Sequence, residues 1–277
     1  MAVVGASGSP EMSGRMRAAP ASERAFLGVS ALLFAASAAA TIARGASMAA
    51  MDAMAMPCGG AMASPFLPPP GETWPGAAAS FLAMWLVMMA AMMLPSLVPM
   101  LRRYRAAVAG TGAARLGRLT VLAGAGYFSV WSVAGMAVFA LGAALAVAME
   151  LPAPARAVPI AAAAVVVSAG ALQFTRWKAR HLASCRAAPN GGRALPADAG
   201  TAWRHGLRLG LHCACSCAGL TAILLVSGIM DLGVMAAVTA AVTAERLAPA
   251  GERVARGIGA VAIAAGLLLF ARALGLG

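Results

Sequence analysis

The chain has 277 residues, of which 61% are hydrophobic and 11% charged, and its mean hydropathy is +0.83. This composition excludes a water-soluble globular domain, which carries about a quarter charged residues. The formal net charge of +12 does not indicate nucleic-acid binding, because the basic residues flank apolar segments in short loops and form no basic face with stacking aromatic residues. Anionic lipid is the more suitable counter-charge.

Seven segments of the chain are apolar over about the 17 to 25 residues that a bilayer-spanning helix needs. They cover residues 25–43, 77–101, 119–149, 157–174, 209–230, 232–244 and 257–271. We therefore predict an all-α protein, a polytopic transmembrane helical bundle of about seven spans. The sixth segment is short and the third is long enough to tilt or protrude, so their ends are the least defined.

Composition divides the chain into a leader and one membrane domain. Residues 1–24 are rich in small residues, which predicts a disordered cytoplasmic leader, and residues 25–277 form the helical membrane domain. Within it we expect a Met-rich outer loop at 44–75 and a flexible inner loop at 186–204. The first span resembles a signal peptide, but its apolar run is longer than a usual signal core, so we expect it to be retained.

The basic residues indicate the orientation. With a cytoplasmic amino end, the inner segments hold nearly all arginines and lysines, and only Arg44, Arg156 and Arg272 lie outside. Because basic residues favour the cytoplasmic side, this asymmetry predicts a multi-pass protein of the bacterial inner membrane with its amino end in the cytoplasm.

Residues 84–100 form the most informative segment, because a bilayer-length helix here carries many thioethers. At about 100° per residue, five methionines share one half of this helix. They are Met84, Met88, Met89, Met92 and Met93. Thioether sulfur is a ligand for Cu(I), whereas the alternative is that Met is a pliant packing residue between helices. We also expect Pro95 and Pro99 to bend or end this helix.

A second group of soft ligands lies in the predicted outer loop. It consists of Met48, Met51, Met54 and Met56, followed by Cys58. Thioethers repeated every two or three residues in a flexible loop suit Cu(I), since Met needs no deprotonation before it binds. A hydrophobic interfacial segment filled with Met and Ala is an equally supported alternative.

Thiols and imidazoles cluster at the inner side. His181 and Cys185 are four apart on the expected inner extension of the fourth span, and Cys213 and Cys217 are four apart in the first turns of the fifth. Each pair shares a helix face. Two consecutive helices thus offer four ligands for the tetrahedral or trigonal site that Zn(II) and Cu(I) favour. His212 falls on the opposite side of the fifth span, as an alternative ligand or a packing residue.

Two acidic residues lie at the ends of spans. We expect Asp231 to be interfacial, whereas Glu245 either pairs with Arg246 or Arg204 or balances a bound cation. The sequence has no phosphate loop, dinucleotide turn, serine nucleophile elbow or His-Glu-x-x-His run. Nothing therefore indicates ATP-driven pumping or hydrolysis.

Several motifs together resemble one bacterial family. They are the Met and double-proline segment Trp85 to Pro99, Gly126 to Trp131, Leu172 to Lys178 with Cys185-Arg186, and Gly206 to Cys217 with Glu245. They are similar to a domain-of-unknown-function family of predicted metal-binding integral membrane proteins, sometimes labelled copper-chaperone-like. The resemblance implies a helical inner-membrane protein that binds a metal and implies no reaction. His181 stands where relatives usually have Cys, and Ala218 where they have Trp.

We expect a copper-handling binder, chaperone or transporter rather than an enzyme. Cu(I) is the expected metal and zinc the alternative. The lipid bilayer is the expected surrounding, and a periplasmic metal carrier is a candidate partner. Two other functions stay open: a membrane thiol–disulfide oxidoreductase that uses Cys213 and Cys217, or Cys185, and a structural bundle whose helices are held by zinc.

Overall fold

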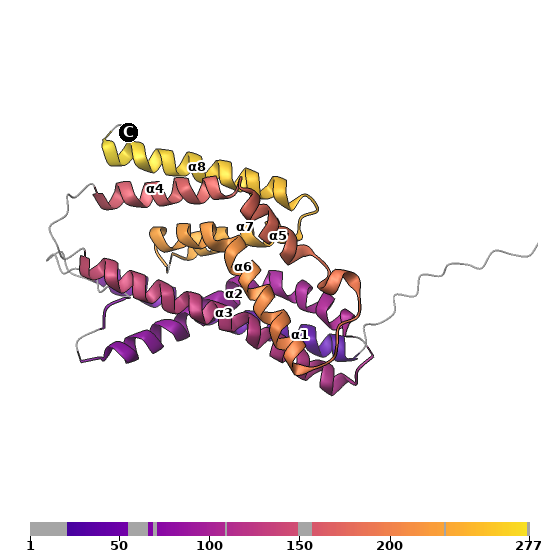
Figure 1. Ribbon diagram of the computed structural model, residues 1–277. Helices are drawn as coiled ribbons and strands as arrows, with labels where there is room; N and C mark the ends of the chain where they lie inside the picture. The colour runs from indigo at the N-terminus through magenta and orange to yellow at the C-terminus, as the bar shows by residue number, and fades with distance from the viewer. Residues whose placement is uncertain are drawn as a thin grey trace, which may run out of the picture.

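The computed structural model describes residues 21–54, 66–68, 71–108, 110–148, 157–229 and 231–275, and the regular structure in these residues is helical throughout. The elements are α1 (Ala21–Met54), α2 (Trp74–Ala107), α3 (Ala113–Ala148), α4 (Ala157–Leu172), α5 (Arg176–Arg186), a short 3-10 turn η1 (Pro189–Gly192), α6 (Ala199–Ser227), α7 (Leu232–Leu247) and α8 (Gly251–Leu274). The predicted all-α bundle is confirmed (Figure 1).

Five helices are long and apolar enough to cross a membrane, namely α1 over Ala21–Ser47, α2, α3, α6 and α8. The pair α4 and α5, bent by 62°, makes a sixth if it is one broken span. Helix α7 has 16 residues, which is about 24 Å at 1.5 Å per residue and less than the hydrocarbon core of a bilayer. The seven apolar segments thus correspond to these helices, with α7 shorter than a full span.

Two helices organise the packing. Helix α2 contacts α1, α3 and α7, and helix α6 contacts α3, α4, α5 and α7, while α8 lies along α4 (Figure 1). Aromatic side chains fill the junction of α2 and α3, where the Trp85 indole nitrogen donates to the Trp131 carbonyl oxygen at 2.9 Å. The interior of the bundle is therefore built around α2 and α6.

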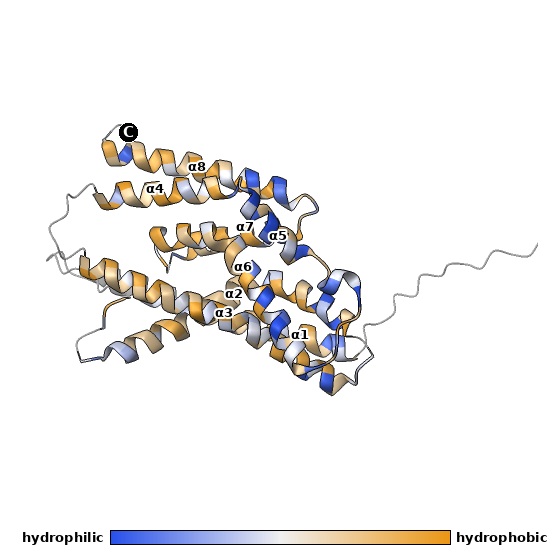
Figure 2. Ribbon diagram, viewed as in Figure 1, coloured by the Kyte–Doolittle hydropathy of each residue, from blue (hydrophilic) through white to orange (hydrophobic). Residues whose placement is uncertain are grey.

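Hydrophilic residues gather at one end of the bundle (Figure 2). This end, which we call the basic end, holds the starts of α1, α3, α6 and α8, the end of α2, and α5, with Arg102, Arg103, Arg115, Arg118 and Arg253 among its residues. Between the ends, large apolar side chains such as Leu32, Val121 and Val261 are exposed. Exposed apolar flanks with polar ends are typical of a lipid-embedded bundle.

Helix boundaries differ from the sequence prediction at three places, because helices continue further than expected. Helix α1 begins within the predicted leader and continues to Met54, so the predicted outer loop is partly helical. Helix α6 begins within the predicted inner loop, where the Asp198 carboxylate caps it by accepting from the Thr201 amide at 2.8 Å. Helix α2 continues through both prolines to Ala107, since packing against three helices offsets the lost backbone bonds.

The bend after α4 was not predicted. The sequence suggested that the fourth span continues straight inward, but α4 ends at Leu172 and the chain turns by 62° into α5. Thr175 caps α5, because its hydroxyl accepts from the Lys178 amide at 3.2 Å. The turn lays α5 against α6.

Helices α3 and α6 approach closely at glycines. A methyl group on Gly126 would lie 2.7 Å from the Trp203 carbonyl oxygen, and one on Gly206 would meet the Ala123 carbonyl. Gly135 of α3 likewise lies against the Trp85 ring, whereas Gly124 faces open space.

Candidate metal centre

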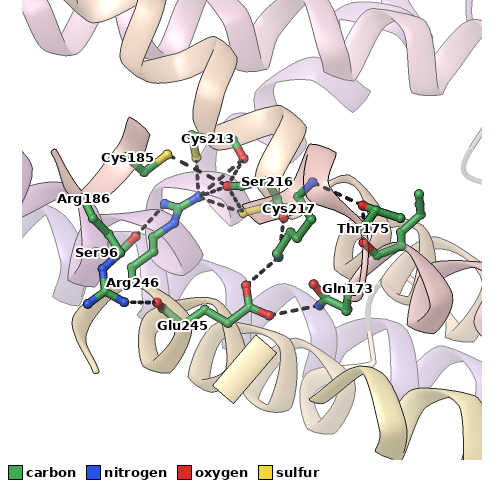
Figure 3. A network of polar contacts seen from close by, with 12 residues as sticks. Ser96, Gln173, Thr175, Cys185, Arg186, Cys213, Ser216, Cys217, Glu245 and Arg246 are labelled. Carbon is green, nitrogen blue, oxygen red and sulfur yellow. Dashed lines mark hydrogen bonds and ion pairs between the residues drawn. The ribbon is translucent and has the colours of Figure 1, made fainter. Parts of the chain in front are cut away.

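Three cysteine side chains from two helices approach α7 inside the bundle (Figure 3). Cys185 comes from α5, and Cys213 and Cys217 come from one face of α6. All three are buried and free. The sequence had suggested that Cys213 lies in the first turns of its helix. Because α6 begins at Ala199, Cys213 instead lies near the middle of this helix.

The guanidinium of Arg246 on α7 lies among these thiols (Figure 3). Its Nη2 atom is 3.0 Å from the Cys213 sulfur and 2.8 Å from the Cys217 sulfur, and it donates to the Ser216 hydroxyl at 3.2 Å. Its Nη1 atom donates to the Ser96 hydroxyl of α2 at 2.9 Å. Arg246 therefore connects α2, α6 and α7 through one side chain that is only 4% exposed.

The methionine face of α2 reaches this cluster at Met93. The Cys213 thiol contacts the Met93 thioether at 3.9 Å, and its sulfur is 2.8 Å from the Tyr127 hydroxyl oxygen. Met88, Met89 and Met92 are also buried in the protein interior. Of the five methionines predicted to share a face, four are therefore buried and Met84 is half-buried.

Two of these methionines line a cavity farther from the basic end. Met84 and Met88, together with Thr41 and Arg44 of α1, surround about 140 Å³ between α1 and α2. The buried methionine face therefore extends from this cavity to the thiols, with Met89, Met92 and Met93 following along α2.

An ion pair lies beside the thiols. The Lys178 ammonium is 2.6 Å from the Glu245 carboxylate and also donates to the Ser216 carbonyl oxygen. The Gln173 amide donates to the same carboxylate at 3.0 Å. From the sequence, Glu245 was expected to pair with Arg246 or Arg204 or to balance a bound cation. In the structure its ion-pair partner is Lys178, which the bend before α5 brings to it. Among the described residues, no carboxylate pairs with Arg246.

The four ligands predicted to form one inner site do not all meet. The Cys185 sulfur is 4.0 Å from the Ser216 hydroxyl, which itself contacts Cys217. His181 instead faces His212 of α6, with their Nδ1 atoms 3.0 Å apart. In the described ranges, no group of three or more His, Cys, Asp or Glu side chains is placed to hold a metal ion. Arg246 occupies the space among the thiols.

The predicted outer ligands are placed only in part. Met48, Met51 and Met54 belong to the last turns of α1 rather than to a flexible loop. Met56 and Cys58 lie outside the described residues. Metal binding by these five residues stays a prediction.

Sequence reasoning missed several residues of this site. Arg246, Tyr127 and Lys178 contact the cluster directly or through Ser216. The available signal was the pair Glu245-Arg246 at the end of an otherwise uncharged apolar helix, in which Arg246 was considered only as a partner of Glu245. Ionisable residues in such helices are often functional.

The fold and the site define the class: an all-helical bundle of membrane-spanning dimensions with a sulfur-rich interior. Residues 82–269 match the PpoB2 family, described as a copper chaperone, and the chain belongs to this family. The match confirms the copper-chaperone-like resemblance inferred from the motifs, and it includes the methionine face, the three thiols and Arg246. No curated protein and no solved structure is significantly similar to this chain.

Proposed function

We propose that the chain binds Cu(I) and carries it, as a chaperone or transporter, within or across the bacterial inner membrane, with its amino end in the cytoplasm. The contact between Met93 and Cys213 carries this proposal, because it joins the methionine face of α2 to the thiols of α6 inside the bundle. Thioethers and thiolates are the ligands that select Cu(I). Membership in a family described as a copper chaperone supports the choice of metal.

Charge balance supports Cys213 and Cys217 as the principal ligands. One Cu(I) ion with two thiolates carries a net charge of −1, and the Arg246 guanidinium, which contacts both sulfurs, supplies +1. The neighbouring Lys178–Glu245 pair is neutral by itself. A neutral assembly is far less costly in a low-dielectric interior than an isolated charge. Met93 is the proposed third ligand. Cys185, whose sulfur contacts the Ser216 hydroxyl beside the two thiols, is a further candidate ligand.

The outer part of the proposed path uses thioethers. Met84 and Met88, at the cavity between α1 and α2, would receive copper from the outer group Met48, Met51, Met54, Met56 and Cys58. Met89 and Met92 would continue toward the thiols. Apart from Cys58, this path supplies neutral thioether ligands, so that the ion moves between them without proton exchange. A periplasmic metal carrier is the proposed donor.

Copper content of the detergent-purified protein tests the principal site. We expect wild-type protein to retain stoichiometric Cu(I) and the double variant Cys213→Ser/Cys217→Ser to bind at least about tenfold more weakly, a loss of about 1.4 kcal/mol. Cys215→Ser is the matched control, since Cys215 lies on the same helix and none of the hydrogen bonds of the cluster involves it. Equal copper affinity in the double variant and the control would contradict the proposal.

A thiol–disulfide oxidoreductase is the second candidate. It is favoured by the free state of Cys213 and Cys217, which lie one helical turn apart and share a contact with Arg246. Thiol trapping after oxidation and reduction, with all metal removed, distinguishes it, because only this function requires a disulfide that turns over. Zinc without copper in the purified protein would instead favour a structural site.

A further inference from the structure

Outside the thiol cluster, the bend between α4 and α5 brings two imidazoles together. His181 of α5 and His212 of α6 have their Nδ1 atoms 3.0 Å apart and their ring centroids 5.2 Å apart. Both side chains are partly exposed, and the proposed copper–thiolate centre uses neither. The third histidine, His205, is elsewhere and stacks on Tyr104 with ring centroids 4.9 Å apart.

The distance between the two Nδ1 atoms is that of a hydrogen bond, in which one ring donates and the other accepts. A neutral imidazole has one N–H and one bare nitrogen, so one Nδ1 must donate and the other accept. If the donating ring moves its proton from Nδ1 to Nε2, both Nδ1 lone pairs face the same point. No proton leaves the protein in this change of tautomer, and two nitrogen ligands from different helices become available to one ion.

The number of available protein ligands favours Cu(I) over Zn(II). A structural zinc site needs four ligands and a catalytic one at least three, whereas no third His, Cys, Asp or Glu joins this pair among the described residues. Cu(I) accepts two ligands, and imidazole suits it. With metal–nitrogen distances of about 2 Å, a linear site separates the nitrogens by about 4 Å. The rings need to part by about 1 Å, which small side-chain rotations at this partly exposed position provide.

We propose that His181 and His212 form a second, two-coordinate Cu(I) site at the partly exposed side of the thiols. His181 lies one turn before Cys185 on α5, and His212 directly precedes Cys213 on α6. Each histidine therefore precedes a buried cysteine on the same helix and is itself partly exposed. This role in copper handling rests on the proposed function, whereas the binding of Cu(I) by the two imidazoles does not.

Cu(I) titration of the full chain in detergent, with the copper ligands identified by X-ray absorption, tests the site. We expect wild-type protein with alkylated thiols to bind one Cu(I) through nitrogen. His181→Ala and His212→Ala should each lose this nitrogen-bound equivalent, and His205→Ala, the matched control, should retain it. Absence of nitrogen-bound copper in the wild type, or its survival in both variants, would overturn the inference. In wild-type protein whose thiols are left free, nitrogen-bound copper without thiol-bound copper would count against the proposed function alone.

A measurement on the unaltered sequence guards against misfolding of the variants. Diethyl pyrocarbonate modifies imidazole nitrogens, and mass spectrometry locates the modified residue. Added Cu(I) should slow modification of His181 and His212 at least about tenfold and leave His205 unaffected. Equal reactivity of all three histidines with and without Cu(I) would also overturn the inference.

Discussion

At the scale of single residues, Arg246 is the unusual feature of the molecule. A buried guanidinium normally has a carboxylate partner, but the adjacent Glu245 is paired with Lys178. Arg246 is left with two sulfurs, two hydroxyls and a carbonyl as its hydrogen-bond partners. Its charge is therefore available to balance the proposed copper–thiolate group, which is negatively charged.

Two replacements of Arg246 test separately whether copper binding depends on the charge of this side chain or on its ability to contact several partners. Arg246→Met should lower Cu(I) affinity at least about tenfold, because truncation of one partner of a buried charge pair costs about 2 to 5 kcal/mol. Arg246→Lys retains the charge but cannot reach both sulfurs and Ser96 at once, so we expect an intermediate affinity. Competition with a Cu(I) chelator measures both.

The control for charge alone is Arg118→Met, because Arg118 is exposed at the basic end. It should bind copper as the wild type does. A copper affinity of Arg246→Met equal to that of Arg118→Met would remove Arg246 from the site.

At the scale of helices, the crossing of α3 and α6 positions Cys213 against Tyr127. Gly126 lies one residue before Tyr127, and a methyl group there would press on the backbone of α6. The distance between these two helices thus sets the position of the thiol that contacts both Tyr127 and Met93.

Two glycines in the same helix make a matched pair. Gly126→Ala should destabilise the protein by about 1 to 3 kcal/mol, because a well-packed interface has no room for the methyl group. Gly124→Ala should be neutral or stabilise it by up to about 1 kcal/mol, since Ala favours helix more than Gly and the site is open. Thermal unfolding in detergent measures the difference, and equal melting temperatures would show that the crossing tolerates a wider spacing.

Local sequence patterns predict the helices and their faces but not the contacts between them. Periodicity correctly gave the common face of Met88, Met89 and Met92, because that relation lies within one helix. It did not give the pairing of His181 with His212, which depends on a 62° turn after α4. The start of α6 at Ala199 was missed because the residues before it are typical of a loop.

At the scale of the whole molecule, sulfur-containing side chains run through the interior from the cavity beside Met84 to the thiols of α6. The outside of the bundle is apolar and its basic end is charged (Figure 2). This separation of a sulfur-rich interior from an apolar exterior depends on the packing of several helices. The sequence indicated only that the methionines share one face of a single helix.

A triple variant tests the methionine face. Met88→Leu/Met92→Leu/Met93→Leu should preserve the fold, because Leu and Met have similar volumes and such exchanges usually cost less than about 1.5 kcal/mol each. We expect it to abolish the sulfur-bound copper that survives thiol alkylation. Met136→Leu is the control, since this methionine of α3 is 40% exposed. X-ray absorption distinguishes sulfur-bound from nitrogen-bound copper, and unchanged sulfur-bound copper in the triple variant would exclude this role of the methionine face.

The side chains around Arg246 come from segments that are synthesised at different times. Ser96 and Cys213 are separated by more than a hundred residues, and Arg246 follows Cys213 by a further helix and turn. During translation both thiols therefore emerge from the ribosome before the cation that balances them. The counter-charge is made only with α7, so the proposed copper site stays incomplete in the growing chain until this helix has been synthesised.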